Sequence, residues 1–554
     1  MDLLLRPARR TGFRLRPAAW SAGAVAVRLA ALAAAAWTAL LLARFGAVVA
    51  TIYWNADAAS ALTIGELFPS VPGDAHVTLA NFPWYATLWF ELATRHLPFH
   101  RQVWEVGPWV GSLAAVGLVC WATARAAGRW AAGVVALLLV CAGHELLFIQ
   151  FAPALHGTAV AYACVLDAFL VLLVARGGRI GPLGAHVVLA AAVAAVAAAG
   201  AASDLLVYPA ALVPFAAAGL AVARLAPGPL ARRVALTTAG VTAGAVAGGQ
   251  AAAAAMRASG AGPAHLALGF TRWDRLVENA LDAVQSLASL FNGGFDDQAL
   301  GVWSALAFAC GVTVAAALVA AIRFGVRWSR ELAGRLRGGA GESAEPLLRT
   351  AHLAFWLLAA ALPVAAFVCS SLAHVWAGRY LVSTAYGLAV VVAVAAAPAG
   401  AGRRAAVTFG AAVVALGSVV ALARSFDPAP GDRMARELLS FLEGEGLTVG
   451  YASYWDAVPL TWRSRFRVQV YPVLTCRRAP HGLCTYPVHV ISSWYRPRRG
   501  VRTFLVADHR YGPPDPGRTL GGTAEVVSFE HYSVYVYDYD IAANLADWRL
   551  YAGS

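Results

Sequence analysis

Runs of about 20 apolar residues recur along most of the chain, and each run is long enough to cross a membrane as a helix. There are about eleven such runs, and several consist mainly of Ala and Gly, which allow helices to pack closely in lipid. The pattern therefore predicts a multi-pass α-helical membrane bundle over residues 25–424, preceded by a basic segment at 1–24. The cores of the predicted helices are 25–48, 107–124, 130–149, 157–175, 182–200, 205–223, 234–255, 299–322, 352–370, 380–398 and 404–423.

Two connections between the predicted helices are long, 51–106 and 256–298, and both lie on the same side of the membrane. The apolar runs stop near residue 425. An amphipathic helix is predicted at 433–446, and the segments after it alternate between apolar and polar residues, as β-strands do. We expect residues 425–554 to form a small α/β domain on the side of the two long loops.

The composition agrees with this pattern. Of the 554 residues, 60% are hydrophobic and 13% are charged, whereas soluble proteins average roughly 25% charged residues. All 43 basic residues are Arg, so chemistry that needs a Lys, such as a P-loop or a Schiff base, is excluded. The net charge of +13 is scattered between apolar runs rather than gathered on one face, and we therefore expect no nucleic-acid partner.

The positions of the Arg residues predict the orientation in the membrane, because cytoplasmic loops carry an excess of positive charge. With a cytoplasmic N-terminus, twenty Arg residues fall in inner loops and seven in outer loops. An odd number of helices then places the C-terminal domain outside, which predicts a protein of the plasma (inner) membrane. An oxidising outer compartment permits a disulfide between Cys476 and Cys484, and two reduced thiols are the alternative.

Polar residues at the outer ends of the predicted helices are candidates for function, since polar groups at membrane depth are costly. Asp57 follows the first helix, close to Asn55. In a partly dry cavity its carboxylate is suited to act as a general base, and the alternative is that it caps a helix beginning at Ala58. Glu145, His156 and Asp204 lie on short outer connections, where interfacial polarity or helix capping is the alternative to ligand binding.

Arg379 and Tyr380 begin a late helix and follow His374. A guanidinium group has the planar set of donors that binds phosphate well, and snorkelling of Arg379 to the membrane surface is the alternative. Within the second long loop, residues 273–291 place apolar side chains at helical spacing. This segment is expected either to lie flat on the outer leaflet or to pack as a loop helix. Asp167 lies inside the fourth helix, where a structural hydrogen bond is the favoured interpretation.

This layout resembles the GT-C glycosyltransferases, membrane enzymes that use polyprenyl-phosphate sugars and include protein mannosyltransferases and arabinosyltransferases. The resemblance rests on the number of helices, on Asp57 at the start of a long first outer loop, on the run Arg379-Tyr380-Leu381, and on an outer C-terminal domain. The stretch 450–461 is similar to the tail of uncharacterised bacterial membrane proteins of this kind. The chain departs from some members in lacking a second acidic residue beside Asp57, and from others in lacking an oligosaccharyltransferase motif in the tail.

The resemblance implies an inverting transfer of a sugar from a polyprenyl-phosphate donor to an extracytoplasmic glycan, lipid or protein acceptor of the cell envelope. Asp57 would deprotonate the acceptor, and Arg379, or Arg272 or Arg275 of the second long loop, would stabilise the leaving phosphate. No cofactor is required, and a divalent metal stays open. The residues expected to bind donor or acceptor are Asn55, Glu145, His156, Asp204, His374, Arg379 and Tyr380.

Three other classes of protein stay open. A transporter or flippase would have ionisable residues near the middle of the membrane and interrupted helices in matching halves. A glycan polymerase or ligase of the cell envelope would use the same lipid donors, with Arg rather than Asp57 as the principal group. A membrane scaffold whose outer domain binds a protein partner is the third class.

Overall fold

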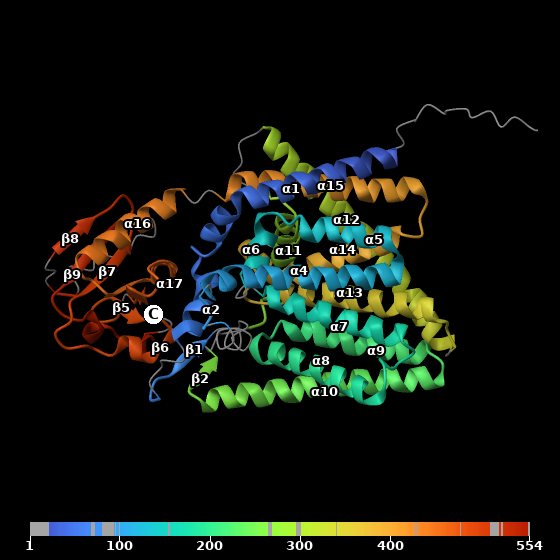
Figure 1. Ribbon diagram of the computed structural model, residues 1–554, viewed down its shortest axis with the longest axis horizontal. Helices are drawn as coiled ribbons and strands as arrows, with labels where there is room; N and C mark the ends of the chain where they lie inside the picture. Colours follow the sequence, from blue (N-terminus) through green and yellow to red (C-terminus); the bar gives the residue numbers. More distant parts are fainter. Residues whose placement is uncertain are drawn as a thin grey trace, which may run out of the picture.

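The computed structural model describes residues 22–67, 73–79, 94, 96–98, 100–152, 156–263, 269–294, 301–338, 341–426, 429–476, 478–509, 520–521 and 525–551. Over these residues the chain folds into a bundle of long helices with a sheet-containing C-terminal domain packed against one end (Figure 1). We call this end of the bundle the domain end. The predicted architecture of a multi-pass helical bundle with a small C-terminal sheet region is confirmed at this level.

Nine helices in the described part of the chain are long and apolar enough to cross a membrane. Each corresponds to one of the predicted runs. They are formed by α1 (Ala22–Ile52), α4 (His100–Ala127), α7 (Gly157–Ala175), α8 (Leu183–Ser203), η3 (Tyr208–Leu212) continued by α9 (Val213–Leu225), α12 (Val302–Gly338), α13 (Ala344–Val368), the end of η5 (Val375–Leu381) continued by α14 (Val382–Ala396), and α15 (Ala401–Ser425).

The prediction of one continuous helix over 130–149 is wrong. The structure has two helices, α5 (Arg129–Val140) and α6 (His144–Phe151), with a bend of 85° between them. A break in lipid leaves backbone carbonyls that need donors. Trp37 Nε1 donates to the carbonyl of Ala142 at 3.0 Å, and Gln150 Nε2 donates to that of Leu139 at 2.9 Å. Counted as one span, this pair is a tenth crossing in the described chain.

The run predicted at 234–255 lies on α10 (Gly228–Ala258), which is not among the nine helices. Its Thr, Gly and Gln residues lower its apolar character. The helix nevertheless lies lengthwise along α8 (Figure 1). The two backbones approach closely, since a Cβ added at Gly249 would lie 3.0 Å from the Cβ of Ala201. The described chain therefore has up to ten candidate crossings, and α10 occupies the position of the remaining predicted run.

The C-terminal domain contains a six-stranded sheet in the order β5-β4-β3-β7-β9-β8. The central strand β3 (Val449–Ser453) runs parallel to β4 (Gln469–Thr475) and to β7 (Thr503–Asp508). The other strands pair antiparallel; they are β5 (Leu483–Thr485), β8 (Glu525–Ser528) and β9 (Tyr532–Tyr537). Helix α16 (Ala429–Gly444) precedes the sheet, and α17 (Tyr454–Arg463) connects β3 to β4. The predicted amphipathic helix at 433–446 therefore forms part of α16.

A second, three-stranded sheet joins the domain to the bundle. Its central strand β1 (Val77–Leu79) comes from the first long loop and runs parallel to β2 (Ala261–Pro263) of the second long loop. On its other side β1 pairs antiparallel with β6 (Val490–Ile491) of the C-terminal domain. The first long loop also forms α2 (Ala56–Leu67), which lies between the bundle and the C-terminal domain and packs on α17 (Figure 1).

The second long loop contains η4 (Trp273–Arg275) and the amphipathic helix α11 (Leu276–Leu290). One face of α11 is buried, and its Asn279 side chain donates to the carbonyls of Val368 and Ser370 at the end of α13. The opposite face is exposed and apolar. The helix therefore packs on the bundle, as one of the two interpretations of 273–291 predicts. It also presents an exposed apolar stripe, formed by Phe270, Trp273, Val277, Leu281 and Val284.

Candidate active site

Asp57 lies in the first turn of α2, directly after the chain leaves the domain end of α1. The side-chain oxygen of Asn55 accepts hydrogen bonds from the backbone N–H groups of Asp57 at 2.9 Å and Ala58 at 3.4 Å. Asn55 is therefore the cap of α2, and the alternative that Asp57 provides this cap is wrong. The Asp57 side chain is left available for contacts outside its own helix, and its position near a helix N-terminus favours the negative charge.

Both oxygens of the Asp57 carboxylate have a partner from a distant part of the chain. Arg379 Nη1, on η5 of the bundle, lies 3.2 Å from Oδ2. The hydroxyl of Tyr454, the first residue of α17 in the C-terminal domain, donates to Oδ1 at 2.9 Å. The Asp57 and Arg379 side chains are 20% and 35% exposed. Asp57 is thus one point at which the bundle and the C-terminal domain meet through polar contacts.

The contacts continue from Arg379 into the bundle. Its guanidinium carbon lies 5.5 Å from the ring centre of Tyr380, and that ring lies 4.8 Å from the ring of His156. His156 Nδ1 is in turn 2.6 Å from Asp204 Oδ2. His156 is the N-cap residue of α7 and Asp204 is the C-cap residue of α8, so two helix ends fix this pair. We call the connected residues Tyr454, Asp57, Arg379, Tyr380, His156 and Asp204 the seam cluster.

A pocket of about 200 Å³ lies beside those residues of the seam cluster that belong to the bundle. His156, Asp204 and Tyr380 form its polar side. The remaining lining is mainly apolar and comes from the ends of the surrounding helices, namely Leu205, Leu206, Pro209, Pro363, Ala366, Phe367, Ser370, Leu372 and Ala373. This arrangement of an apolar cavity with a few converging polar groups is typical of ligand sites.

On the domain side, three aromatic rings surround the Asp57 carboxylate. The Tyr454 ring stacks on Tyr486 with centres 4.9 Å apart and an interplanar angle of 3°, and its centre lies 6.0 Å from the His489 ring centre. Burial, followed by the nearby negative charge of Asp57, holds the pKa of Tyr454 well above its usual value and raises the pKa of Tyr486 to about 12. The Tyr454 phenol therefore stays protonated and acts as a hydrogen-bond donor to Asp57.

Helix α11 lies behind the Arg379 segment. It packs against η5, and a Cβ added at Gly378 would lie 3.5 Å from the Cβ of Ser286. The exposed apolar stripe of α11 is on the opposite face of the same helix from this buried Ser286. One short helix therefore links a surface suited to lipid with the segment that holds Arg379.

The structure does not bring every candidate residue into the seam cluster. Glu145 is half exposed and pairs with its neighbour His144 at 3.5 Å, and the His374 side chain is exposed. Arg272 and Arg275 form exposed ion pairs with Asp274 and Glu278. Tyr454 was missed as a site residue, although it lies in the tail stretch 450–461 that carries part of the resemblance.

Within the described part of the chain there is no group of three or more His, Cys, Asp or Glu residues close enough to hold a metal ion. The seam cluster instead offers two carboxylates, one guanidinium group, one imidazole and two phenol groups around the junction of bundle and domain. These groups are suited to accept a proton, to bind an anion and to donate hydrogen bonds.

Comparisons with known proteins add no further information: no family model matches the chain, and neither a curated protein nor a solved structure similar to it was found.

Proposed function

We propose that the protein is a GT-C-like membrane glycosyltransferase that moves a sugar from a polyprenyl-phosphate donor to an acceptor of the cell envelope. The observation that carries the proposal is the Asp57–Arg379 pair, which places a carboxylate and a guanidinium group together at the junction of the bundle and the C-terminal domain. The reaction needs both groups, one to accept a proton and one to stabilise a phosphate.

The proposed step is a single displacement at the anomeric carbon of the donor sugar. The acceptor oxygen forms a bond to this carbon while its proton passes to the Asp57 carboxylate. The bond between the anomeric carbon and the phosphate oxygen breaks, and the polyprenyl phosphate leaves with the electron pair. Arg379 stabilises the negative charge of the leaving phosphate. The configuration at the anomeric carbon is inverted because attack and departure occur on opposite faces of the sugar.

The 3.2 Å contact between Asp57 and Arg379 has a consequence for this mechanism. The base and the leaving group lie on opposite sides of the sugar, so the sugar must enter between the two side chains. The ion pair therefore opens when the donor binds. Tyr454 keeps its hydrogen bond to Oδ1 of Asp57, and Arg379 turns to the phosphate while it stays against the Tyr380 ring.

The lipid tail of the donor has a route that supports the proposal. The exposed apolar stripe of α11 contacts the acyl chains at the membrane surface, and the pocket beside His156, Asp204 and Tyr380 offers an apolar wall close to Arg379. A tail bound along these surfaces would bring its phosphate to the guanidinium group. His156 and Asp204 would then orient the donor.

We also propose that the domain end faces the extracytoplasmic side of the plasma membrane. The distribution of Arg in the N-terminal segment and in the connections between helices, twenty on the opposite side and seven on this side, supports this orientation. The disulfide between Cys476 and Cys484 also supports it, because such bonds persist in oxidising compartments. A reporter fused to the C-terminus that is active only outside the cytoplasm would give the expected result, and a cytoplasmic signal would contradict it.

To test the activity, membranes that contain the protein are incubated with radiolabelled polyprenyl-phosphate sugars. The transfer of label to envelope material is then measured. Relative to wild type, Asp57→Asn is expected to lower the rate about 10²–10⁴-fold, because it removes the base. Arg379→Gln is expected to lower it about 10²-fold or more, because it removes the charge opposite the leaving phosphate.

The matched control is Asp74→Asn, which alters another Asp–Arg pair at the domain end, the contact of Asp74 with Arg496 at 2.8 Å. This pair is exposed, and its loss is expected to leave transfer unchanged. Undiminished transfer by Asp57→Asn would overturn the assignment of the base. Wild-type membranes that transfer label from none of the lipid donors would overturn the proposed function.

The interior of the bundle supports a transferase over a transporter. Asp167 on α7 accepts hydrogen bonds from His352 Nδ1 and Trp356 Nε1, both at 2.9 Å, and His352 Nε2 lies 3.0 Å from Thr123 Oγ1. The Asp167 and His352 side chains are fully buried. This pair joins four residues inside the bundle, as expected of a structural network rather than of a transport path.

A further inference from the structure

A second, larger cleft lies between the three-stranded sheet and the C-terminal domain, and its volume is about 940 Å³. One wall comes from β1, β2 and the last turn of α10, including His76, Thr78 and Arg257. The other wall comes from the C-terminal domain, including Tyr486, Tyr495 and the turn η8 (Trp548–Leu550). Ligand pockets in proteins typically measure about 300–1,000 Å³, so the cleft has room for an extended ligand.

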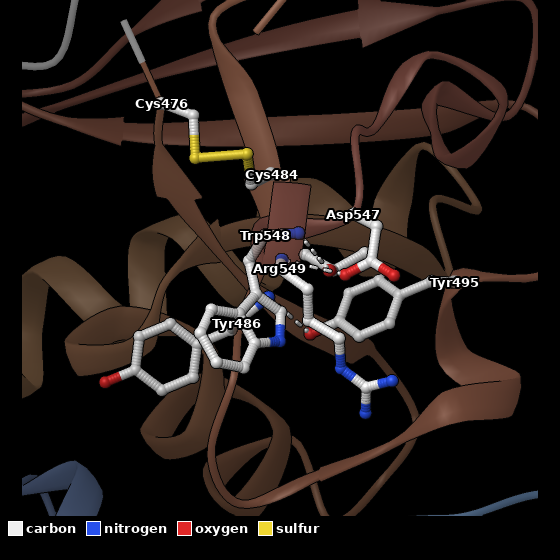
Figure 2. Close-up of a disulfide and its surroundings, with 8 residues drawn as sticks. Cys476, Cys484, Tyr486, Tyr495, Asp547, Trp548 and Arg549 are labelled. Atoms are coloured by element: carbon white, nitrogen blue, oxygen red, sulfur yellow. Dashed lines mark hydrogen bonds between the residues drawn. A yellow bond between two sulfur atoms is a disulfide. The ribbon is translucent and has the colours of Figure 1, made fainter. Parts of the chain in front are cut away.

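The disulfide fixes the domain wall of this cleft. Cys476 and Cys484 are bonded at the edge of the sheet, and Cys484 pairs with Ala546 in an isolated bridge. The next residue, Thr485, donates its N–H to the carbonyl of Ala546 at 3.0 Å, and its hydroxyl accepts a hydrogen bond from the N–H of Trp548 at 3.4 Å. Figure 2 shows the bonded cysteines directly above the residues that line the cleft.

Aromatic rings form one part of the cleft surface. Tyr486 and Trp548 are half-buried, and both line the cleft. Tyr495 is held in place because its hydroxyl donates to the carbonyl of Pro472 at 2.6 Å and accepts from the N–H of Tyr486 at 3.3 Å. The face of an aromatic ring carries partial negative charge, and the C–H groups on the face of a sugar ring carry partial positive charge. Rings positioned by such contacts are suited to stack against sugar rings.

Positive charge forms the other part. Arg257 and Arg549 line opposite walls of the cleft, and both side chains are exposed. Among the described residues, neither guanidinium group has a hydrogen-bond or ion-pair partner. The nearest carboxylate in sequence, Asp547, accepts instead from the backbone N–H of Arg549 at 3.0 Å. In Figure 2 the Arg549 guanidinium group points away from the Asp547 carboxylate.

We propose that this cleft binds an acidic carbohydrate chain, which is the acceptor of the transferase. Arg257 and Arg549 bind its carboxylate or phosphate groups, and Tyr486 and Trp548 stack against its sugar rings. The cleft is joined to Asp57 by two consecutive contacts, the stack of Tyr486 on Tyr454 and the hydrogen bond from Tyr454 to Asp57. The wall of the cleft is therefore close to the base that would deprotonate a bound chain.

The role of the cleft as the acceptor site rests on the proposed function, whereas the binding of an acidic carbohydrate in the cleft does not. The experiment accordingly measures binding. The full-length protein in lipid nanodiscs is titrated by calorimetry with tetragalacturonic acid and, separately, with the neutral tetrasaccharide maltotetraose. Wild type is expected to bind the acidic probe at least about tenfold more tightly than the neutral one, because only the acid forms charge-assisted hydrogen bonds with the two Arg residues.

The double variant Arg257→Gln/Arg549→Gln is expected to lose this preference, and Trp548→Ala is expected to weaken binding of both probes. The control is Arg502→Gln, which removes an exposed Arg of the same domain that does not line the cleft. The titration contains no sugar donor, so a failure of the proposed transfer step leaves the binding result intact.

Three outcomes would overturn the proposal. The first is that neither carbohydrate binds to wild type. The second is that the double variant binds tetragalacturonic acid as tightly as wild type does. In the third, the single-stranded nucleotide tetrathymidylate, which also offers rings and negative charges, binds more tightly than the acidic carbohydrate. Melting temperatures of all variants, measured in the same nanodiscs, identify any variant that has lost its fold.

Discussion

At the scale of single residues, His489 is a buried titratable group beside the seam cluster on its domain side. Its ring centre lies 6.0 Å from that of Tyr454, and its side chain is within electrostatic range of Asp57. Burial lowers the pKa of His489 from 6.5 to about 4, and the negative charge of Asp57 opposes this shift in part. The imidazole is therefore neutral in the folded protein at neutral pH.

This lowered pKa predicts how stability changes with pH. Between pH 6.5 and about 4 the unfolded chain binds a proton at His489 more readily than the folded protein does. The contribution of neutral His489 to the free energy of unfolding is therefore complete above pH 6.5. As the pH falls toward 4, protonation of His489 in the unfolded chain removes this contribution, and the loss is about 2 kcal/mol at pH 5. The apparent melting temperature of wild type should fall over this range, and that of His489→Gln should fall less.

The control for this prediction is His531→Gln, which alters a partly exposed histidine of the same domain. Its melting temperature should follow that of wild type at every pH. Parallel curves for wild type and His489→Gln would contradict the assignment of the acid sensitivity to His489.

Most of the seam cluster could be predicted from the sequence. Asp57, Asp204 and Arg379 were detectable because charged residues directly beside apolar runs are rare and therefore conspicuous. Tyr454 was not, because a tyrosine in an ordinary amphipathic domain is not unusual and its contact with Asp57 spans 397 residues. The direct ion pair between Asp57 and Arg379 was also not predictable. The two residues lie 322 positions apart in the sequence, and they were expected to have separate roles.

At the scale of helices, close packing depends on glycines at defined contacts. Gly387 on α14 faces α13, and a Cβ at this position would lie 2.7 Å from the Trp356 carbonyl oxygen and 2.8 Å from the Ala360 Cβ. Both distances are shorter than van der Waals contact, and a backbone carbonyl in a packed helix cannot move aside easily. Small residues at such contacts are what hold neighbouring helices together in lipid.

Gly387→Ala is therefore expected to destabilise the protein by about 1–3 kcal/mol through overpacking. The matched control is Gly240→Ala on α10, where an added Cβ would meet nothing within 4 Å. There the higher helix propensity of Ala should leave stability unchanged or slightly raised. Apparent melting temperatures in one detergent provide the measurement, and equal values for the two variants would contradict the proposed close contact.

The length and apolarity of each run were sufficient to predict the helices but not their interruptions. The bend between α5 and α6 depends on donors from elsewhere in the chain, Trp37 for the carbonyl of Ala142 and Gln150 for that of Leu139. The side-chain amide of Asn292 also lies against Gly143 in the bend. It is so close that a Cβ added at Gly143 would overlap the amide. Hydropathy along one segment contains none of these contacts, and the pairing of β1 with β2 and β6 was missed for the same reason.

At the scale of the whole molecule, the C-terminal domain is fixed to the bundle by the three-stranded sheet and by polar contacts beside it. Thr78 of β1 pairs with Val490 of β6. Next to this pair, the N–H of Ser492 donates to the carbonyl of His76 at 2.8 Å, and the N–H of His76 donates to the Ser492 hydroxyl at the same distance. These contacts predict that the domain keeps one position relative to β1.

The double variant Thr78→Cys/Val490→Cys tests this arrangement. Paired residues on adjacent strands have Cα atoms at a separation that a disulfide spans, so mild oxidation should cross-link the two positions. After cleavage at a protease site introduced between them, the fragments should stay joined in a denaturing gel until a reductant is added. Thr78→Cys/Val527→Cys, with the second cysteine on β8 at the far edge of the six-stranded sheet, should not cross-link.

The three-stranded sheet also fixes the order in which the molecule is assembled. Strand β1 leaves the ribosome early, β2 follows about 180 residues later, and β6 is synthesised only after the last membrane helix, α15. Until that time β1 has at least one unpaired edge, which is a place where foreign strands attach. Folding of the domain end is therefore the last step of biogenesis, and a chain stalled before residue 490 is left with an open strand at the membrane surface.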